Sequence, residues 1–565
     1  MGAAGARYDQ EGSAVPNESG LNEYEYHLFD TLRSGDFNRR DFIRKATAMG
    51  IGVPIIGSIL NAVEPMGAGA ATRSAHALRP KRGGTARVGV NVPTAAPDPV
   101  MMADEGGIVT VQMAGEYLVT PDQNWNLLPV LAQSWKSTNP KTWTFTLRKG
   151  VKFHSGQPMT ADDVVATFDR LTDPKVGSAA LSAFSGILAK GQIEKVSEYV
   201  VTFHLSVPFV DFPYLLSPFN YNAIILPHNY KIGTFMKTGS GTGAYKVTGY
   251  TPDQGATFAK NKSYWSPGMP YLDGIKLSYY QDTATGVLDM QGGQYDYLPS
   301  ITYGSGQALF SNPNVVIQRH ASSGYRTIQM RTDIAPFNNV FLRRAVADAL
   351  DRKGMIKALL GGFATIGNDD YFAPVFPISK LASKQVPQRN QNIAKAKQEL
   401  AQGGQPNGFA VTLTTEQYQE IPNLAVVIQQ NLKSIGVDVT LNVETQTAYY
   451  GSGANQPWLS TPFGITDWGA RGVPSQGITP AYTCSGTWNS AHWCNTSFDK
   501  LLGSLNASLD ETTRMRIAAQ MATIQHDAVP DAIAYWLDDL QAHGKNVHIG
   551  YAPSNYVNPR AMWLA

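Results

Sequence analysis

The residue types that most often carry out catalysis are present in this chain, but their spacing matches none of the common catalytic patterns. The ten histidines are scattered, and neither H-E-x-x-H nor C-x-x-C, the ligand spacings of many zinc sites, occurs. His543 and His548 lie close in sequence and are interpreted as surface histidines. The G-x-S-x-G turn of serine hydrolases is also missing. The sequence therefore predicts no enzyme, no metal ion and no cofactor.

A glycine-rich run and three aspartate pairs are the remaining candidates for chemistry. The run Gly239-Ser240-Gly241-Thr242-Gly243 could cradle a phosphate, but it lacks the G-K-[ST] ending and opens a strand-like segment rather than a helix. The pairs Asp162-Asp163, Asp369-Asp370 and Asp538-Asp539 could in principle work as acid/base dyads. We interpret them instead as carboxylates at helix starts or in loops.

The chain contains only two cysteines, Cys484 and Cys494. In an oxidising compartment this pair could form a disulfide that closes a short loop around Trp488. Two unpaired buried thiols are the alternative.

Composition limits the class of protein. A chain of 565 residues, with 43% hydrophobic and 16% charged residues, is typical of several globular domains rather than a disordered protein. Lys and Arg total 46 against 44 Asp and Glu, so there is no basic excess for binding nucleic acid.

The first 77 residues are predicted to be an export signal and leader. Arg39-Arg40 precedes an uncharged stretch over residues 46–63, and Ala75-His76-Ala77 has the A-x-A form of a cleavage site. The arginine pair resembles the twin-arginine signal, which exports folded proteins to the periplasm. A membrane anchor is the alternative, because the uncharged stretch could almost span a bilayer. Glycine and proline interruptions favour cleavage, which would leave a soluble periplasmic protein.

The elements expected to position any site are strands early in the chain and helices later. Trp143, Phe145 and Leu147 alternate with polar residues and, with residues 151–153, predict a hairpin. A helix is predicted to start at Thr160. Further helices are predicted over residues 339–350, 422–435 and 511–528, the second of them stopped by Gly436 and followed by a strand over 437–443. A helix followed by a strand is typical of an α/β lobe.

Several blocks of sequence, in this order and spacing, resemble the extracytoplasmic solute-binding proteins of peptide/nickel-type ABC importers, bacterial solute-binding protein family 5. The resemblance covers nearly all of residues 83–540. Its blocks are Leu128–Trp135, Trp143–Gly156, Thr160–Val164, Gly241–Tyr245, Asn261–Trp265, Pro336–Asn339, Arg343–Arg352 and Asn495–Asp499.

The resemblance implies an α/β periplasmic binding protein of type II, cluster C-like, with two lobes, a hinge between them and an extra subdomain on the first lobe. Carried over to this chain, lobe I is expected over 78–120, 241–327 and 533–565. The extra subdomain is expected over 121–240 and lobe II over 328–532. Two crossings of the chain between the lobes would permit closure on a ligand. The implied partners are a small-molecule or peptide ligand and a permease with its ATPase subunits; the protein is expected to be a monomer.

The resemblance also indicates candidate ligand-binding residues. The family's peptide binders use a Trp followed three positions later by an Asp that pairs with the peptide amino group. Here Trp468 fits, but Arg471 occupies the Asp position. A buried guanidinium would repel an ammonium group and requires an anion or other acceptors. Arg471 is therefore expected to contact a ligand anion, or alternatively to pair internally with Asp467.

Aromatic and acidic residues complete the predicted site. Four of the ten Trp lie between residues 458 and 493, and Trp488 is expected to line the cleft with Trp468. On the first lobe, Asp104 and Glu105 align roughly with the family's cleft segment and could bind a cationic part of the ligand.

The predicted function is the capture of a peptide, or of a carboxylate-bearing solute such as an opine or sugar conjugate, in the periplasm. The alternatives are a periplasmic enzyme or chaperone on the same scaffold, or the binding of a nickel chelate.

Overall fold

The computed structural model describes residues 7–8, 14–15, 80–451, 456–552 and 556–565. It divides the chain into two units, Met1–Pro80 and Lys81–Ala565. In the first unit, β1 (Arg7–Tyr8) pairs antiparallel with β2 (Ala14–Val15). The predicted export signal with Arg39-Arg40 and the predicted cleavage site lie outside the described residues. Among the residues that are described, no helix is long and apolar enough to cross a membrane.

The second unit is built on one mixed sheet of eleven strands. From one edge to the other the order is β10, β11, β12, β3, β13, β19, β14, β18, β16, β17, and β15 pairs with β19 beside this path. The strands are β3 (Thr85–Asn91), β10 (Tyr245–Thr251), β11 (Gly255–Lys260), β12 (Gly274–Tyr280), β13 (Tyr297–Ile301), β14 (Val315–Met330), β15 (Ala364–Ile366), β16 (Ala410–Glu416), β17 (Asp438–Glu444), β18 (Phe463–Trp468) and β19 (Asp531–Gly544).

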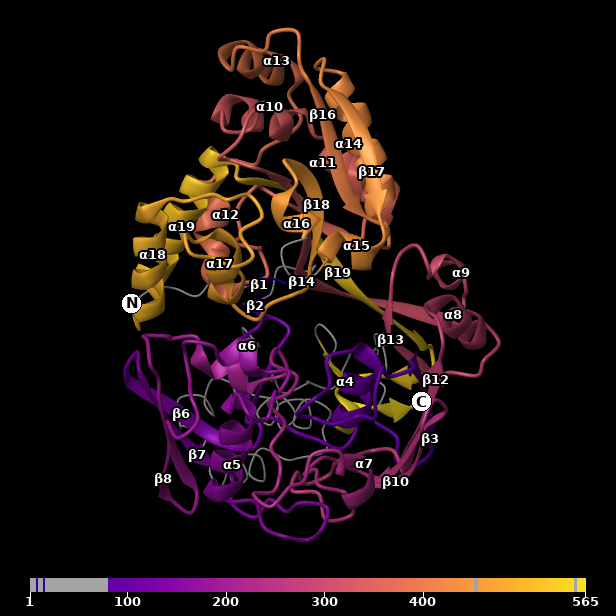
Figure 1. The fold of residues 1–565 in the computed structure, drawn as a ribbon. Helices are drawn as coiled ribbons and strands as arrows, with labels where there is room; N and C mark the ends of the chain where they lie inside the picture. The colour runs from indigo at the N-terminus through magenta and orange to yellow at the C-terminus, as the bar shows by residue number, and fades with distance from the viewer. Residues whose placement is uncertain (1–6, 9–13, 16–79, 452–455, 553–555) are drawn as a thin grey trace. The chain divides into compact units, whose positions relative to one another are not determined.

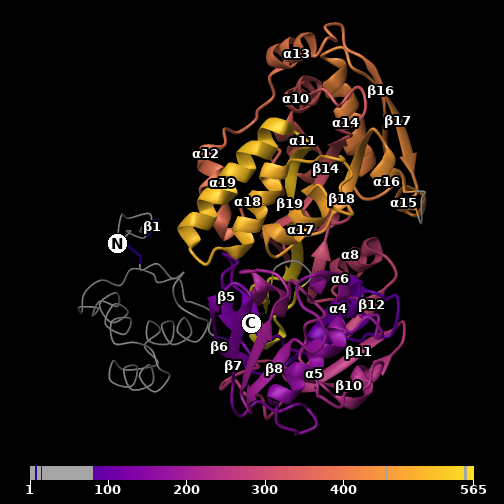
Figure 2. The same ribbon diagram turned by 60° about the vertical axis from the view of Figure 1, so that its left-hand side comes forward.

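Two of these strands, β14 and β19, are much longer than the rest and run through both lobes. Figure 1 and Figure 2 show them between the elements around β3 and those around β16. The first part of β14, up to Ala321, pairs with residues 538–544 of β19, beside β13. The last part, from Tyr325, pairs with β18 and with residues 531–536. We therefore call residues 85–321 and 538–565 the first lobe, and residues 325–536 the second lobe.

The pairing of β14 with β19 is interrupted between the lobes. Ala321 pairs with Asp538 and Tyr325 pairs with Trp536, so β14 has more residues than β19 in this interval. Such a bulge bends a strand and weakens the ladder locally. Ser322, Ser323 and Gly324 therefore form the junction between the two lobes.

The first lobe carries an additional antiparallel sheet in the order β6 (Ala132–Asn139), β7 (Thr142–Leu147), β9 (Val200–His204) and β8 (Ile193–Ser197). This sheet shares one hydrophobic core with the rest of the first lobe, because residues of both belong to the same cluster of buried side chains. The helices of this lobe are α4 (Glu105–Gln112), α5 (Ala161–Thr172), α6 (Leu181–Phe184), α7 (Phe235–Thr238), α8 (Thr283–Gln291) and α9 (Gln307–Phe310), with the 3-10 turn η2 (Phe212–Leu216).

The alternating Trp143, Phe145 and Leu147 are buried on one face of β7, as predicted. The predicted hairpin with residues 151–153 is wrong, because β7 pairs with β6 and β9 instead. Residues 151–153 form only an isolated bridge, between Lys152 and Pro158. Alternation identified the strand but not its partners, which lie farther away in the sequence.

The second lobe surrounds its part of the sheet with helices, as Figure 1 shows for α10, α13 and α14 around β16 and β17. The predicted helices are present, although α14 ends at Lys433 rather than near Ile435. The helices are α10 (Val340–Ala349), α11 (Arg352–Leu360), α12 (Ala382–Gln385), α13 (Ile393–Gln402), α14 (Ile421–Lys433), α15 (Gln446–Tyr450), α16 (Pro457–Ser460), α17 (Pro474–Tyr482), α18 (Thr496–Ala507) and α19 (Glu511–Ala528).

The glycine-rich run has a structural role in the first lobe. Buried Glu116 accepts hydrogen bonds from Thr242 Oγ1 (2.9 Å), Tyr264 Oη (2.5 Å) and Trp265 Nε1 (2.9 Å). Gly241 and Gly243 pass so close to the carbonyl of Ala114 that a Cβ at either position would collide with it. The blocks Gly241–Tyr245 and Asn261–Trp265 therefore hold the start of β10 and the segment after β11 against the residues that follow α4.

Candidate ligand-binding cleft

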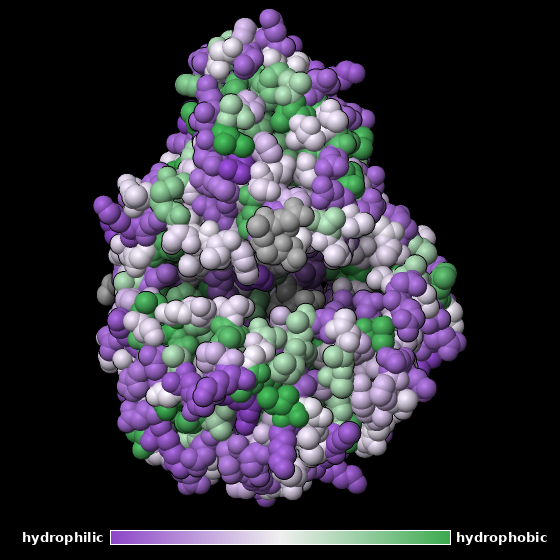
Figure 3. Space-filling model, in the orientation of Figure 1, coloured by the Kyte–Doolittle hydropathy of each residue, from purple (hydrophilic) through white to green (hydrophobic). Residues whose placement is uncertain are grey.

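A cavity of about 310 Å³ lies where the lobes meet. In Figure 3 a furrow crosses this face of the molecule between the lobes. The cavity is lined by first-lobe residues Pro218, Phe219, Tyr221 and Pro299–Tyr303, by second-lobe residues Arg326, Leu360, Phe363, Tyr418–Glu420 and Asp467–Arg471, and by Ser322, Gly324 and Leu537–Gln541 of the crossing strands. Both lobes and the junction between them thus contribute to one site.

Trp468, the last residue of β18, is held rigidly in the cavity wall. Its ring is stacked on that of Tyr325, with centroids 6.0 Å apart and an interplanar angle of 13°. Its Nε1 donates a hydrogen bond to Thr327 Oγ1 (3.1 Å). Because the polar atom of the indole is satisfied inside the protein, the ring offers the cavity a fixed apolar surface.

The guanidinium of Arg326 is buried beneath the same wall and is fully paired. Its side chain is only 1% exposed, and it forms ion pairs with Asp467 and with Glu420 (Nε to Oε1, 3.0 Å). Burial raises the pKa of Asp467, and Arg326 opposes this rise. The Asp467 side chain nevertheless remains 28% exposed to the cavity that it lines.

Arg471 lines the cavity without such a partner. Ser323 fixes its main chain, since Arg471 N donates to Ser323 Oγ (2.8 Å) and this hydroxyl donates to Arg471 O (2.7 Å). The half-buried guanidinium donates one hydrogen bond, from Nη1 to Ala470 O (3.2 Å). Among the residues that the structure describes, no ion pair joins Arg471 to a carboxylate, and Asp467 pairs with Arg326 instead. The guanidinium therefore has donors available for a ligand.

Two aspartates of β19 belong to the cavity lining, and the side chain of one of them, Asp538, is fully buried. Asp538 forms an ion pair with Arg319, and burial raises the pKa of Asp538 to about 6. Asp539 lies beside it in the cavity lining. The earlier interpretation of this pair as helix-start or loop carboxylates is wrong, because both residues lie within a strand. The Asp162-Asp163 pair does begin a helix, α5, where Thr160 and Asp163 form a capping box.

Three of the predicted ligand-binding residues are outside the cavity lining. Asp104 caps α4 by accepting a hydrogen bond from Gly107 N (2.9 Å), and its other oxygen accepts one from Thr94 Oγ1 (2.8 Å). Glu105 lies behind the wall, next to Ser300, and burial raises its pKa to about 7. Trp488 packs against Trp468, with ring centroids 6.2 Å apart. The lining residues therefore include Trp468 and Arg471 from the predicted set.

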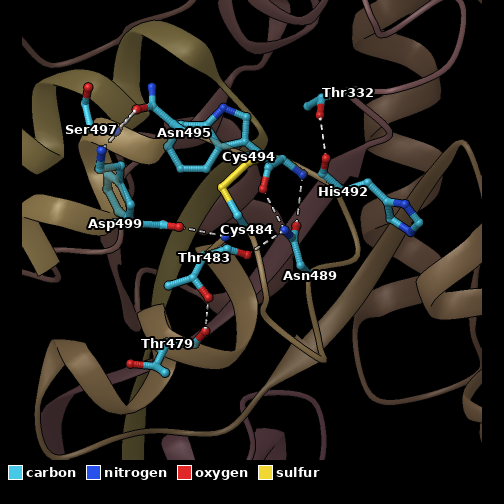
Figure 4. The surroundings of a disulfide bond; sticks show 12 residues. Thr332, Thr479, Thr483, Cys484, Asn489, His492, Cys494, Asn495, Ser497 and Asp499 are labelled. Atoms are coloured by element: carbon cyan, nitrogen blue, oxygen red, sulfur yellow. Dashed lines mark hydrogen bonds between the residues drawn. A yellow bond between two sulfur atoms is a disulfide. The ribbon is translucent and has the colours of Figure 1, made fainter. Parts of the chain in front are cut away.

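The structure joins Cys484 to Cys494 in a disulfide between α17 and α18. Figure 4 shows the surrounding hydrogen bonds: Asn489 Nδ2 donates to Thr483 O (3.0 Å) and to Trp493 O (2.6 Å). The loop carrying Trp488 is thus closed covalently and supported from inside. In the described part of the chain, no group of three or more His, Cys, Asp or Glu residues could hold a metal ion.

Two lobes joined by two strand crossings, with a polar cavity between them and an extra antiparallel sheet on one lobe, define a periplasmic binding protein. Residues 126–490 match the family described as bacterial extracellular solute-binding proteins, family 5 Middle. The chain belongs to this family. It is the substrate-binding component of an ABC importer, acts outside the cytoplasm and is not an enzyme.

Relatives with different ligands resemble the chain to a similar degree. Heme-binding protein A of Haemophilus influenzae is 28% identical over 458 residues, which cover 75% of this chain and 80% of that protein. Glutathione-binding protein GsiB of Escherichia coli is 27% identical over 443 residues, covering 75% and 84%. The structure of AgaA from A. tumefaciens R10 in complex with agropinic acid superposes with a TM-score of 0.63 at 24% identity, over 82% of this chain and 94% of that one.

Proposed function

We propose that the cleft captures a small organic solute that carries a carboxylate and a cationic group, and that the protein delivers it to an ABC permease. The observation that carries this proposal is the guanidinium of Arg471, which lines the cavity without a carboxylate partner among the described residues. A guanidinium has five donors and binds a carboxylate well through two parallel hydrogen bonds. A ligand carboxylate would supply the missing acceptors.

The acidic residues of the cavity favour a cationic group on the same ligand. Asp467 keeps part of its side chain exposed, and Asp539 of β19 belongs to the cavity lining. A peptide, glutathione and many opines combine an amino group with one or more carboxylates. The names of the relatives, which include a glutathione-binding protein and a protein in complex with agropinic acid, support this class of ligand.

The proposal is tested by finding a ligand and then changing Arg471. Thermal-shift screening of the purified protein against peptides, glutathione, opines, sugar conjugates and nickel chelates would identify a ligand, and calorimetry would measure its affinity. Arg471→Ala is expected to weaken binding by about 2–5 kcal/mol, because truncating one member of a desolvated charge pair leaves the other uncompensated. Arg471→Asp is expected to abolish the binding of an anionic group.

Arg344→Ala is the matched control, since Arg344 lies in the same lobe outside the cavity and donates only to Asp527 O (2.7 Å). The affinity of Arg344→Ala for the ligand should equal that of the wild type. Equal affinity of Arg471→Ala and the wild type would exclude Arg471 from ligand binding and would reopen recognition of an ordinary peptide amino group.

We also propose that the protein reaches the periplasm through the twin-arginine route. The basis is the Arg39-Arg40 pair before a weakly apolar stretch interrupted by glycines. Replacing both arginines with lysine is expected to leave the precursor in the cytoplasm, as cell fractionation and immunoblotting would show. Normal delivery of this variant to the periplasm would contradict the proposed route.

A further inference from the structure

A second cavity, of about 340 Å³, adjoins the ligand-binding cleft. Trp143 and Tyr214 line it from the first lobe, and Phe376 lines it from the second. The two cavities lie close together, because Arg471 lines the cleft and the next residue, Gly472, lines the second cavity. They are separated by a layer that is several side chains deep.

That layer is a row of aromatic rings. Phe219 lines the cleft, and its ring centroid lies 4.5 Å from that of Trp125. Trp125 is fully buried, and its centroid lies 5.6 Å from that of Phe376 in the wall of the second cavity. The rings of Phe219, Trp125 and Phe376 thus form a continuous partition between the cleft and the second cavity.

The partition is fixed in place from several sides. Trp125 lies in the turn between β4 (Val119–Pro121) and β5 (Leu127–Pro129), with a φ of 63°, a conformation that residues other than glycine rarely adopt. Its carbonyl accepts a hydrogen bond from Tyr214 Oη (2.8 Å). At Gly472, a Cβ atom would lie 2.6 Å from Phe219 Cγ, so only glycine lets the Phe219 ring pack against the backbone at this position.

We propose that Phe219 and Trp125 determine the length of the ligand by ending the cleft at this partition. This inference rests on the proposed function, since it concerns the ligand of the same cleft. A ligand that reaches Phe219 must end there. The second cavity, whose lining includes aromatic rings, would accept an apolar extension of the ligand only when the partition is opened.

The inference is tested by the variant Phe219→Ala. Phe219 is only half-buried, so its truncation should leave the protein folded. Free-ended peptides of increasing length, with apolar residues at either end, are the probes for calorimetry. The wild type is expected to bind the short members and to lose affinity once the length exceeds the cleft. Phe219→Ala should gain at least about tenfold in affinity for the longer peptides. Trp125→Ala should likewise bind longer peptides than the wild type does.

Phe372→Ala is the matched control. Phe372 is a buried phenylalanine of the hydrophobic cluster that also contains Trp125, but it lines neither the cleft nor the second cavity. The affinity of Phe372→Ala should depend on peptide length in the same way as the affinity of the wild type. An unchanged dependence on length for folded Phe219→Ala, or the same gain for Phe372→Ala, would overturn the inference.

A crystal structure of the double variant Phe219→Ala/Trp125→Ala, which removes both rings between the cleft and Phe376, separates this inference from the proposed function. If the wild type binds no peptide, the peptide form of the proposed function fails. The partition is then judged by the structure alone: one continuous cavity is expected, and two separate cavities would overturn the inference.

Discussion

Arg326 and Arg471 line the same cavity but have opposite surroundings. Arg326 lies between Asp467 and Glu420 and is therefore already neutralised by the protein. Arg471 has its main chain fixed by Ser323, and among the described residues its guanidinium donates only to the carbonyl of Ala470. A fixed backbone with an unpaired charged end is the arrangement expected of a residue that binds a ligand, because its position is set before the ligand arrives.

The sequence predicts Trp468 and Arg471 as ligand-binding residues from the spacing of a short motif, and both residues line the cavity. The sequence also predicts Asp104, but an aspartate before a helix serves equally well as a cap, and in the structure Asp104 caps α4 outside the cavity lining. Sequence reasoning missed the role of Asp538 and Asp539, whose contacts depend on pairing between β19 and β14. The arginine that pairs with Asp467 was also unpredictable, since it is 141 residues away in sequence.

A buried carboxyl group should make the stability of the protein depend on pH. Burial raises the pKa of Asp370 to about 8, and Asp369 beside it also raises this pKa. Between about pH 4 and pH 8 the unfolded chain has therefore lost this proton while the folded protein keeps it, so stability falls as pH rises. Asp370→Asn removes this contribution and still offers an acceptor for Phe372 N, which donates to Asp370 Oδ1 (2.9 Å).

We expect the stability of Asp370→Asn relative to the wild type to rise from pH 5 to pH 8, by at most about 1.4 kcal/mol per pH unit. Urea unfolding at both pH values measures the difference. Other buried carboxyl groups, such as Asp531, titrate in both proteins and cancel in the comparison. Parallel pH dependences of the two proteins would contradict the prediction.

At the scale of elements, local patterns were sufficient for helices and insufficient for sheet partners. The helix predicted over residues 511–528 is α19, which Asp510 caps at its start. The partners of β7 come from residues 132–139 and 200–204, and no local pattern in β7 specifies them. The order of the eleven strands is fixed by packing between distant segments, which the resemblance to a family could supply and periodicity could not.

The disulfide between Cys484 and Cys494 is expected to stabilise the loop that supports Trp468 through Trp488. Replacing both cysteines with serine should lower the free energy of unfolding by about 2–3 kcal/mol, because the unfolded chain is no longer constrained by the short loop. Unfolding in denaturant measures this loss.

Reductant serves as the control for the disulfide. It should lower the stability of the wild type toward that of the double serine variant and leave the variant unchanged. Titration of two free thiols in denatured, unreduced protein from the periplasm would contradict the presence of the bond in the exported protein.

At the scale of the whole second unit, the lobes also meet outside the ligand cavity. Arg514 of α19 pairs with Asp211 just before η2, at 2.5 Å between Nη2 and Oδ2, and both side chains are largely buried. Next to this pair, Val210 N donates to Asn506 O (3.0 Å). These contacts connect the two lobes away from the β14–β19 crossing and should therefore favour the closed form.

Arg514→Ala is expected to speed ligand dissociation, because the closed form loses a buried ion pair and leaves Asp211 without its partner. An increase in dissociation rate of about tenfold or more is expected from the loss of such a pair. Stopped-flow tryptophan fluorescence measures the rate. Lys190→Ala is the control, since Lys190 and Asp173 form an exposed pair within the first lobe. Unchanged dissociation from Arg514→Ala would show that this contact does not hold the lobes closed.

The position of β19 has a consequence for biosynthesis. This strand is synthesised after β13, β14 and β15, yet it lies in the middle of the sheet and pairs with all three of them. A nascent chain that ends before residue 531 therefore lacks the strand that holds β13 beside β14, and neither lobe can complete its sheet until residues 531–544 have been synthesised. The central pairing of the sheet must therefore follow the synthesis of β19, so a chain that terminates before it would expose the unpaired edges of β13 and β14 and be a substrate for proteases.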